Sequence, residues 1–528
     1  RAFKWGQNAG LQFVPSKTEA IIFTRKIFKN EPKKLTINGS EIQYSKNVKW
    51  LGINLDSKLY FREHIKQKIS KAKAHFMMIR NMIGTHWGPS PKALRWAIQG
   101  ILIPSISYGS IVWSKVCNEI SIRDKLTKLN RFMALSLMPA RRSTPTAGLE
   151  LILGLKPLDI KIEQVALNCF TRVLHKDSIK WSAPYKVDKG HLWRGKELLS
   201  NIGIHDYDFD VTNSLNLNKR YTIDFESFKK GQPDTGQSFC CYTDGSKMNG
   251  QTGYGYAITS GNWVMAQGNG QMSPINTVFQ AEICAIKHCV ENIELLDTSN
   301  NLVIYSDSQA ALYALESHKH KQHCVKECAD ALNSIGATKN VKLKYIKAHI
   351  GHVGNELADM LAKSGTSEVS KKVVVAPPIS WAKQQIENYS VNKWNSRWNS
   401  VKSSYRQTKI WYSKYNKKAA KFFLNLSRHE LGLVVQFLTG HNRLNRHQAL
   451  MYPNIDENCR KCKEKPETSW HLIADCPYFM NERRDIFHVR DRLKDKPEWE
   501  HNQIIKFIRK INFDSLNEGG DSSVNSGQ

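Results

Sequence analysis

Apolar and polar positions along this chain follow two different periods. Between roughly residues 60 and 175, apolar side chains recur every three or four positions, as in "HIKQKISKAKAHFMMIRNMI", which is typical of helices with one buried face. Further along, "SFCCYTDGS" and "NLVIYSDSQ" alternate instead, which is typical of strands. Between these two runs, "NTVFQAEICAIKHCVENIELL" returns to helical spacing, and "VKLKYIKA" predicts a further strand. The middle of the chain is therefore expected to be a compact α/β unit.

Changes of pattern and polarity divide the chain into consecutive segments. We expect the end of a mixed α/β unit, a helical region, a polar linker, a compact α/β domain, a basic aromatic helical segment, a Cys/His cluster and a C-terminal tail. Their predicted boundaries are, in that order, 1–55, 56–175, 176–236, 237–366, 367–450, 451–490 and 491–528. The final residues, "NEGGDSSVNSGQ", are polar and are expected to be disordered.

One apolar stretch is long enough to be tested as a membrane span. "WAIQGILIPSISYGSIVW", from Trp96 to Trp113, carries no charge over its 18 residues. Pro104, a glutamine, two glycines and three serines weaken this interpretation, because a spanning helix needs about 20 predominantly apolar residues. We expect instead a buried pair of helices that breaks near Pro104, and no membrane partner.

Positive charge is concentrated outside the compact α/β unit. The chain has 77 Lys+Arg against 47 Asp+Glu, a formal net charge of +30. Such an excess is typical of proteins that bind nucleic acids, although a solubilising surface can also be basic. Residues 239–366 hold 10 Lys, no Arg and 11 Asp+Glu, a net charge of −1, so the other residues carry +31. A nucleic-acid partner is therefore expected to contact the flanking segments.

The most basic segment also contains many aromatic residues. Lys383–His447 has 13 Lys+Arg against 2 acids. Six aromatic residues are interleaved with these charges: Trp394, Trp398, Tyr405, Trp411, Tyr412 and Tyr415. This mixture suits nucleic-acid backbones and base stacking. It equally suits an amphipathic helix whose aromatic residues are in the core and whose lysines are solvated, so both alternatives stay open.

The cysteines and the N-terminus bear on the cellular compartment. The 11 cysteines are scattered, and Cys240 and Cys241 are adjacent, which argues against a secreted disulfide framework. The first residue is Arg and no signal-peptide pattern follows, so we interpret the sequence as a fragment of a longer protein. We expect an intracellular protein, in the nucleus and cytoplasm, that is not secreted.

Four acidic residues occupy positions where acids are unusual. Asp244 and Asp307 end the first two predicted strands. Glu282 follows a capping-box pattern and lies on the apolar stripe of its helix, where a carboxylate is unfavourable unless something neutralises it. Asp359 lies near the start of a later helix, in "HIGHVGNELADMLAK". Each position alone has an ordinary explanation as a turn, a cap or a satisfied core acid.

Taken together, the four carboxylates indicate a cation site. Four converging acids repel one another, so they raise a pKa or require cations. Ligand sets made only of oxygen suit hard cations such as Mg²⁺. Two such ions about 4 Å apart can clamp the attacking and leaving oxygens of a phosphodiester. This hypothesis requires that the fold brings the four residues together.

The motifs that carry these acids resemble the type-1 ribonuclease H fold. The matching sequences are "YTDGSK", "FQAEICAI", "YSDSQAAL" and "HIGHVGNELAD", in the order of that family. The resemblance implies an α/β fold with a mixed sheet and flanking helices. It also implies that Asp244, Glu282, Asp307 and Asp359 hold two catalytic Mg²⁺ ions. His349, ten residues before Asp359, matches the histidine of the family's mobile loop.

The resemblance also implies a reaction. Metal-activated water would attack a phosphodiester of the RNA strand in an RNA–DNA hybrid, leaving a 5′-phosphate and a 3′-hydroxyl. The 2′-hydroxyl is the group that can distinguish RNA from DNA. His349 would assist turnover or product release rather than act as the base. We find no separate basic handle in this region, so the domain alone is expected to bind its substrate weakly.

The flanking sequences resemble polyproteins of non-LTR retrotransposons. "GLQFVPSKTEAIIFT" and "KWLGINLDSKLYFREHI" are similar to the end of the palm and the start of the thumb of their reverse transcriptases. "RRSTPTAGLELILGLKPL" is similar to their connecting region, which implies a mainly helical thumb and connection and an upstream polymerase portion as partner. The polymerase's aspartate pair occurs nowhere in the 528 residues, so we predict no DNA synthesis by this chain alone.

A Cys/His cluster lies near the C-terminus. Cys459, Cys462, His471 and Cys476 have the order and spacing of a structural Zn²⁺ site with three thiolates and an imidazole. Together with the upstream "FLTGHNRLNRH", the cluster resembles the zinc knuckle in the tail of the same polyproteins. The group "HKHKQHCVKEC" is a weaker candidate, because its two cysteines have helical spacing and are expected to face the core.

Two functions are compatible with these features. The first is an RNA–DNA hybrid ribonuclease within a retroelement polyprotein, with RNA, DNA or hybrid bound by the basic flanks. The second is a catalytically inactive, nucleic-acid-binding remnant of a mobile element. All four carboxylates and His349 are present and no frame break is visible, which favours the active nuclease.

Overall fold

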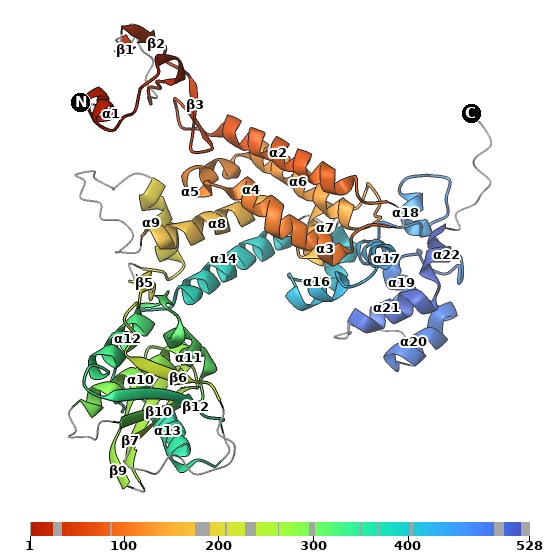
Figure 1. Ribbon diagram of the computed structural model, residues 1–528. Helices are drawn as coiled ribbons and strands as arrows, with labels where there is room; N and C mark the ends of the chain where they lie inside the picture. The colour runs from red at the N-terminus through yellow and green to blue at the C-terminus, as the bar shows by residue number, and fades with distance from the viewer. Residues whose placement is uncertain are drawn as a thin grey trace. The chain divides into compact units, whose positions relative to one another are not determined.

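The structure is a computed structural model in which the chain divides into two compact units (Figure 1). The helical unit comprises Arg1–Cys169 and Glu387–Gln528, and the sheet unit comprises Phe170–Ile386. The structure describes residues 2–24, 34–37, 39–84, 87–174, 191–205, 208–226, 239–261, 263–294, 301–348, 351–367, 369–401, 405–489 and 501–518.

The helical unit combines both ends of the chain. Two small antiparallel sheets come first in the sequence: β1 (Leu35–Ile37) with β2 (Ser40–Ile42), and β3 (Asn47–Trp50) with β4 (Ile53–Asp56). The helices before the sheet unit are α1 (Ala2–Asn8), α2 (Arg62–Arg80), α3 (Pro91–Ala97), α4 (Ile103–Ser107), α5 (Ser110–Trp113), α6 (Ile120–Leu137), α7 (Thr146–Leu153) and α8 (Leu158–Val173). Those after it are α14 (Ile379–Ser400), α15 (Arg406–Trp411), α16 (Lys417–Phe423), α17 (Arg428–Thr439), α18 (Asn445–Ala449), α19 (Ser469–Ala474), α20 (Met480–Phe487), α21 (His501–Lys510) and α22 (Phe513–Glu518).

These helices share one hydrophobic core. On α2, Ile65, Ala72 and Phe76 are buried at the helical spacing seen in the sequence. Phe76 contacts Phe132 of α6 edge to face, with ring centroids 5.5 Å apart. The same core continues through α7, α17, α19 and α21. The predicted helical periodicity of this region is therefore confirmed.

The uncharged stretch from Trp96 to Trp113 forms short consecutive helical segments. A π-helical turn, Ile98–Leu102, follows α3 and leads into α4, which contains Pro104 in its first turn. Because proline lacks an amide hydrogen, the regular hydrogen-bond ladder changes at this point. The chain then breaks at Gly109, whose φ is 68°. No helix among the described residues has the length and apolar character needed to cross a bilayer.

The aromatic residues of the basic segment belong to the core of the helical unit. Trp398 is 2% exposed, and its indole nitrogen donates to the carbonyl of Tyr412 at 2.9 Å. Four of the six rings are buried and two pack against the same core: Trp394, Trp398, Trp411 and Tyr412, then Tyr405 and Tyr415. Buried rings are not available to bases. The base-stacking alternative is therefore wrong for Trp394, Trp398, Trp411 and Tyr412, and the core alternative is confirmed for them. Tyr405 and Tyr415 are only half-buried, so both alternatives stay open for these two rings.

The predicted C-terminal tail, 491–528, is wrong for residues 501–518. These residues form α21 and α22, and Ile504, Phe507 and Phe513 are buried in the core of the helical unit. The signal was present in "IIKFIRKINF", whose apolar residues recur at helical spacing. Beyond residue 518, the predicted disorder falls outside the described residues.

The sheet unit alternates strands and helices. Its helices are α9 (His191–Asn201), α10 (Val278–Ile293), α11 (Gln309–Glu316), α12 (His323–Ile335) and α13 (Val353–Ser364). Its strands are β5 (Ser214–Leu215), β6 (Tyr221–Asp224), β7 (Phe239–Met248), β8 (Gln251–Ser260), β9 (Trp263–Met272), β10 (Asn301–Ser306), β11 (Lys319–His320) and β12 (Asn340–Tyr345).

A six-stranded mixed sheet forms the centre of this unit, in the order β6-β12-β10-β7-β8-β9. The first four strands in that order are parallel, whereas β7, β8 and β9 form an antiparallel meander. Helices α10 and α12 share a core with Cys241 and Ile304 on one face. Ala358 of α13 packs with Tyr242 and Tyr305 on the other. The predicted mixed sheet with flanking helices is therefore confirmed (Figure 1).

The predicted linker, 176–236, is wrong for part of its length. Strand β6 pairs in parallel with β12 and so becomes the sixth strand of the sheet. Tyr221 of β6 is 3% exposed, and its hydroxyl donates to the carbonyl of Leu315 at 2.8 Å. A four-residue strand among polar residues shows too little periodicity to be recognised from the sequence.

The same segment contributes a buried acid that meets α12. Asp210 accepts hydrogen bonds from the backbone N–H of Cys324 at 2.9 Å and from Gln280 Nε2 at 2.8 Å. The Cys324 thiol donates at 3.1 Å to Asp210 Oδ2, the same oxygen that accepts from Gln280. Cys324 and Cys328 are both buried, so the prediction that these two cysteines face the core is confirmed.

Candidate active site and metal centre

Pairing of two parallel strands brings Asp244 and Asp307 together. In the register of β7 and β10, Thr243 lies opposite Ser306, and the two aspartates are the next residues along each chain. Neighbouring parallel strands place such residues side by side. Strand β10 ends at Ser306, and Asp307 directly follows it, close to the predicted position. Strand β7 continues past Asp244 to Met248 in a hairpin with β8, so the prediction that Asp244 ends its strand is wrong.

A glycine allows Glu282 to approach these aspartates. Helix α10 begins with the predicted capping box, in which Gln280 N–H donates to Thr277 Oγ1 at 3.2 Å and Thr277 N–H donates to Gln280 Oε1 at 3.1 Å. A Cβ on Gly245 would lie 2.7 Å from the backbone nitrogen of Glu282. Any side chain at that position would therefore push α10 away from β7 and carry Glu282 away from Asp244.

The three carboxylates form one compact group. Oxygens of Asp244, Glu282 and Asp307 lie within 4.8 Å of one another. Asp244 is 8% exposed and Glu282 is 5% exposed, whereas Asp307 is half-buried. The N–H of Gly245 donates to Asp244 Oδ1 at 2.8 Å, but the buried Oε2 of Glu282 has no hydrogen-bond partner among the described residues.

The electrostatics of this group disfavour the ionised forms. Burial and then the charge of Asp307 raise the pKa of Asp244 to about 7, against a smaller opposing effect of the Gly245 N–H. Burial and then the charges of Asp244 and Asp307 raise the pKa of Glu282 well above its ordinary value. A cation among the three would remove both penalties. The oxygen-only donor set and the unpartnered Glu282 oxygen therefore fit a hard divalent cation.

Asp359 lies beside this group but is engaged with a lysine. It comes from α13, which packs closely on β8 because a Cβ on Gly255 would lie 2.3 Å from the backbone nitrogen of Ala362. Asp359 contributes to the raised pKa of Asp244, and its Oδ2 accepts from Lys363 Nζ at 2.6 Å. Its role as a fourth metal ligand stays a prediction. The spacing of four residues on a helix is the sequence signal for this ion pair.

The remaining predicted site residue, His349, lies outside the described residues, so its role stays a prediction. The helix that follows begins at Val353, with His352 at the N-cap. Asp359 is therefore nearly two turns into α13 rather than near its start. This position matters because it places Asp359 over the sheet instead of at the helix end.

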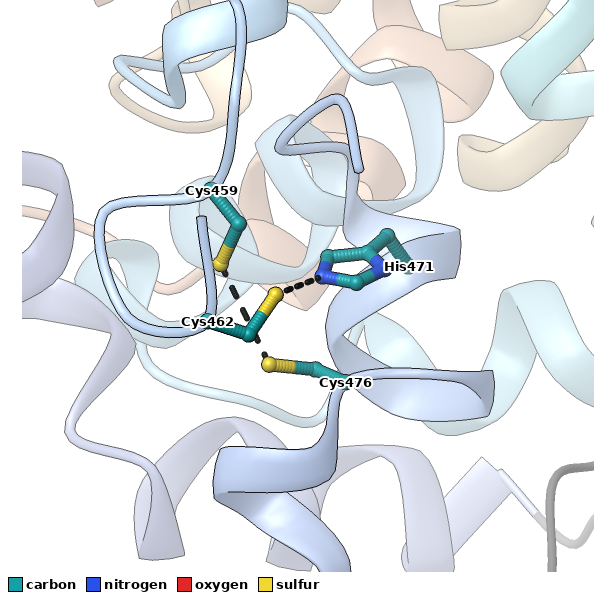
Figure 2. A group of neighbouring side chains, drawn as sticks. All are labelled: Cys459, Cys462, His471 and Cys476. Atoms are coloured by element: carbon teal, nitrogen blue, oxygen red, sulfur yellow. Dashed lines mark hydrogen bonds between the residues drawn. The ribbon is translucent and has the colours of Figure 1, made fainter. Parts of the chain in front are cut away.

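The four Cys/His residues surround a single point in the helical unit. Cys459 and Cys462 border a turn, His471 lies on α19, and Cys476 follows that helix (Figure 2). Cys459 Sγ and Cys476 Sγ are 3.9 Å apart, and Cys462 Sγ is 3.2 Å from His471 Nε2. All four ligand atoms lie within 4.8 Å of one another.

This second group fits a tetrahedral metal site. Two thiolates on one Zn²⁺ ion are expected to be about 3.8 Å apart, given a Zn–S distance of about 2.3 Å. A hydrogen bond from Cys476 lowers the pKa of the Cys459 thiol to about 3, and the pKa of Cys476 is raised in turn by the same hydrogen bond. The thiolate form of Cys459, which is the form that binds a metal, is therefore favoured. Cys459, Cys476 and His471 are buried, as is typical of a structural site.

The sequence around the carboxylate group is similar to a known protein family. The sequence model of the RNase H family matches residues 236–367. A Pol polyprotein from the type-1 retrotransposable element R1 of Nasonia vitripennis is 24% identical over 165 residues, which cover 30% of this chain and 48% of that protein. The corresponding polyprotein of Bradysia coprophila is 23% identical over 158 residues, which cover 30% of this chain and 16% of that protein.

Among solved structures, RNase H1 from the archaeon Halobacterium salinarum NRC-1 has a TM-score of 0.20 at 19% identity, with 24% of this chain and 96% of that chain covered.

The chain spans less than half of the length of the two R1 polyproteins. The matched segment contains the strands and helices that carry Asp244, Glu282, Asp307 and Asp359. Residues 236–367 thus form an RNase H domain, in a chain homologous to the Pol polyproteins of R1 non-LTR retrotransposons.

Proposed function

We propose that this chain hydrolyses the RNA strand of RNA–DNA hybrids with two Mg²⁺ ions. The observation that supports this proposal is the convergence of Asp244, Glu282 and Asp307, whose oxygens lie within 4.8 Å inside the RNase H domain. Burial and the neighbouring acids raise the pKa of Asp244 and of Glu282, which is unfavourable for a group with only a structural role. A catalytic role explains it, because active sites commonly hold such groups.

Each residue of the site would have a separate role in catalysis. Bound Mg²⁺ ions would supply an activated water and charge neutralisation at the phosphodiester. Asp244 and Glu282, which are buried and held by β7 and α10, would orient the cations rigidly. Asp307, which is half-buried, would face the substrate side. Asp359 would be the fourth metal ligand, at the margin of the site, and His349 would assist turnover or product release.

We further propose that Cys459, Cys462, His471 and Cys476 hold a structural Zn²⁺ ion. The closed set of four ligands supports a structural role, because catalytic zinc sites keep one position open. The ligands also lie inside the hydrophobic core of the helical unit, where Cys459 and Cys476 are 0% exposed. A metal at this position would therefore cross-link the chain where its helices pack.

Nucleic-acid binding is proposed to come mainly from the basic segments outside the RNase H domain. Residues 239–366 carry a net charge of −1, so they attract a polyanion poorly. The upstream polymerase portion of the polyprotein is the proposed protein partner, and the nucleus and cytoplasm are the proposed compartments. We expect no DNA synthesis by this chain alone.

A substrate panel tests this function. The full chain should cleave the RNA strand of an RNA–DNA hybrid with Mg²⁺, and should leave duplex DNA and duplex RNA intact. Withdrawal of Mg²⁺ by dialysis should abolish cleavage without removing tightly bound Zn²⁺. Hybrid binding without cleavage in the presence of Mg²⁺ would overturn the nuclease proposal and favour an inactive, nucleic-acid-binding remnant.

A further inference from the structure

A group of cationic side chains in the helical unit has no role in the functions considered so far. We call it the Arg/His cluster and define it as Arg131, Arg141, His441 and His447. Arg131 lies on α6 and His447 on α18, whereas the other two lie in the loops that precede α7 and α18. The rings of His441 and His447 are 4.6 Å apart between centroids, and Arg131 and Arg141 are among the charges that act most strongly on His441.

The loops that carry the cluster are held in place by hydrogen bonds. Arg131 Nη1 donates to the carbonyl of Thr144 at 2.5 Å and to Thr146 Oγ1 at 3.0 Å. His441 Nδ1 lies 3.2 Å from Ser143 Oγ. Gly440 ends α17 with a φ of 72°, which turns the chain back toward α6. The fold therefore positions Arg131, His441 and the two loops that carry the cluster.

The second loop is also tied to the Cys/His segment. Asn442 Nδ2 donates to Ser469 Oγ at 3.0 Å, and Ser469 is the first residue of the helix that carries His471. Asn445 Nδ2 donates to the carbonyl of Asn458, the neighbour of Cys459, at 2.8 Å. The Cys/His segment thereby holds the loop in place. Such bracing preorganises a binding site and lowers the entropy lost on binding.

Positive charge in the cluster is not balanced by acid. After burial, the largest influences on the pKa of His441 come from His447, Arg131 and Arg141, and all three lower it. Arg141 is half-buried, and its pKa is lowered first by burial and then by Arg443. No carboxylate is among these influences. The lowered pKa of both histidines leaves them neutral near pH 7, so the positive charge of the cluster comes from Arg131 and Arg141, and two guanidinium groups without a neighbouring acid attract an anion.

Buried polar atoms in the cluster also lack partners. His447 is 9% exposed, and its Nε2 makes no hydrogen bond to any described residue. The hydroxyl of Thr144, which is 0% exposed, has none either. An unsatisfied buried polar group costs about 1–3 kcal/mol. An anionic oxygen that accepts from His447 Nε2 and from a guanidinium would satisfy both the charge and the hydrogen-bonding capacity.

We propose that the Arg/His cluster binds a phosphate group of a nucleic-acid backbone. This inference rests on the proposed nucleic-acid-binding role of the basic segments, and it names the residues that make one such contact. Guanidinium groups match phosphate oxygens in fork geometry, which a lysine ammonium does not. No bond is broken at this site. Its function is to hold a strand while the carboxylates of the RNase H domain act elsewhere on the nucleic acid.

The substitution Arg141→Gln tests this inference. The side chain of Arg141 makes no hydrogen bond or ion pair to another described residue, and the substitution keeps the backbone carbonyl that accepts from Thr144 N–H, so the thermal midpoint should stay unchanged. Binding of a fluorescein-labelled oligouridylate to the full chain should weaken about tenfold, and the slope of log affinity against log salt should fall by about 0.7, the value of one phosphate contact on a single strand. Arg141→Lys, which keeps the charge without the fork, should bind with intermediate affinity.

Arg123→Gln is the matched control, because Arg123 is an exposed arginine on the same α6 as Arg131. Equal effects of Arg141→Gln and Arg123→Gln would overturn the inference. Should Arg141→Gln fold poorly, unchanged affinity in Arg141→Lys would do so as well. Inorganic phosphate that stabilises the parent but not Arg141→Gln, with oligouridylate affinity equal in both, would assign the cluster to free phosphate and overturn the nucleic-acid assignment.

Hybrid cleavage by the parent protein, measured in parallel, reports separately on the nuclease proposal. If the parent does not cleave the hybrid, the nuclease proposal fails while the oligouridylate comparison still decides the cluster. If the parent cleaves and Arg141→Gln binds like the parent, the cluster assignment fails alone.

Discussion

The two candidate metal centres of this chain are built in opposite ways. The carboxylate group collects Asp244, Glu282 and Asp307 from three separate elements of the sheet unit. The Cys/His group collects all its ligands from one short stretch, residues 459–476, in the core of the helical unit. Burial and neighbouring acids raise the pKa of Asp244 and Glu282, whereas a hydrogen bond lowers the pKa of Cys459.

This difference separates a site for chemistry from a site for folding. Buried acids that repel one another destabilise the fold until a cation binds, and that unfavourable state is acceptable where the cation does catalytic work. Thiolates that close around one point inside a core offer no open position to a substrate. The comparison therefore predicts that one centre can lose a ligand and stay folded, while the other cannot.

Cys459→Ala should have the largest effect. Structural Zn²⁺ contributes about 10–16 kcal/mol in small zinc-binding peptides, which is comparable to the whole stability of a domain, about 5–15 kcal/mol. We expect loss of bound zinc and cooperative unfolding of the helices around it, measured by metal analysis and thermal unfolding of the full chain. Cys117→Ala is the control, since Cys117 is 2% exposed in the same core. Similar losses in both variants would contradict a structural metal.

Asp244→Asn should show the reverse behaviour. The change removes a proposed metal ligand, so cleavage of the hybrid should fall at least about 10³-fold, or about 4 kcal/mol of transition-state stabilisation. The thermal midpoint should stay the same or rise, because one of the repelling charges is gone. Asp330→Asn serves as control, since Asp330 is an exposed acid on α12 of the same unit. Equal cleavage by Asp244→Asn and Asp330→Asn would refute the site.

The pH dependence of stability should also reveal the repulsion. Folded Asp244 keeps its proton up to about pH 7, whereas an unfolded aspartate releases it near about pH 3.9. Between these values the folded state binds more protons, so the free energy of unfolding should fall as pH rises, by an amount on the order of 1–4 kcal/mol. Urea unfolding in Mg²⁺-free buffer measures this change. The dependence should weaken when Mg²⁺ is added, and it should also weaken in Asp244→Asn, where Glu282, whose pKa is raised as well, keeps the remainder. An unchanged dependence in that variant would assign it to groups other than Asp244.

Asp359→Asn should have the smallest effect of the four. Asp359 is already paired with Lys363 at 2.6 Å and lies outside the compact group of three acids. We expect hybrid cleavage to fall about tenfold, or about 1.4 kcal/mol, in steady-state assays with saturating Mg²⁺. A loss as large as that of Asp244→Asn would instead make Asp359 a full member of the metal-binding set.

Much of the sheet unit could be predicted because its signals are local. The alternation around Asp307 and the capping box at Thr277 each involve residues within one element. Strand β6 and helices α21 and α22 escaped prediction for different reasons. Strand β6 is too short to show a period, and its pairing partner β12 lies more than a hundred residues away along the chain. The apolar face of α21 was readable, but it was obscured by polar sequence on both sides.

The aromatic basic segment shows where composition alone is insufficient. Trp398 and its neighbours suit a core and a nucleic-acid surface equally well, since an aromatic ring stacks in both. Only the packing of α14 and α15 into the core of the helical unit decided between them. The same limit applied to Asp359, whose partner Lys363 was visible in the sequence but whose distance from the other acids was not.

By itself, the sequence determined the identity of the candidate ligands and their chemistry: oxygen donors on a predicted sheet, and three thiolates with an imidazole at knuckle spacing. These properties depend on side-chain type and on neighbours in the chain. The tertiary structure alone decided that Gly245 lets Glu282 reach Asp244, and that Arg131, Arg141 and His447 gather in one cluster. Such contacts join residues far apart in the sequence, and their energies depend on burial and packing that no local pattern contains.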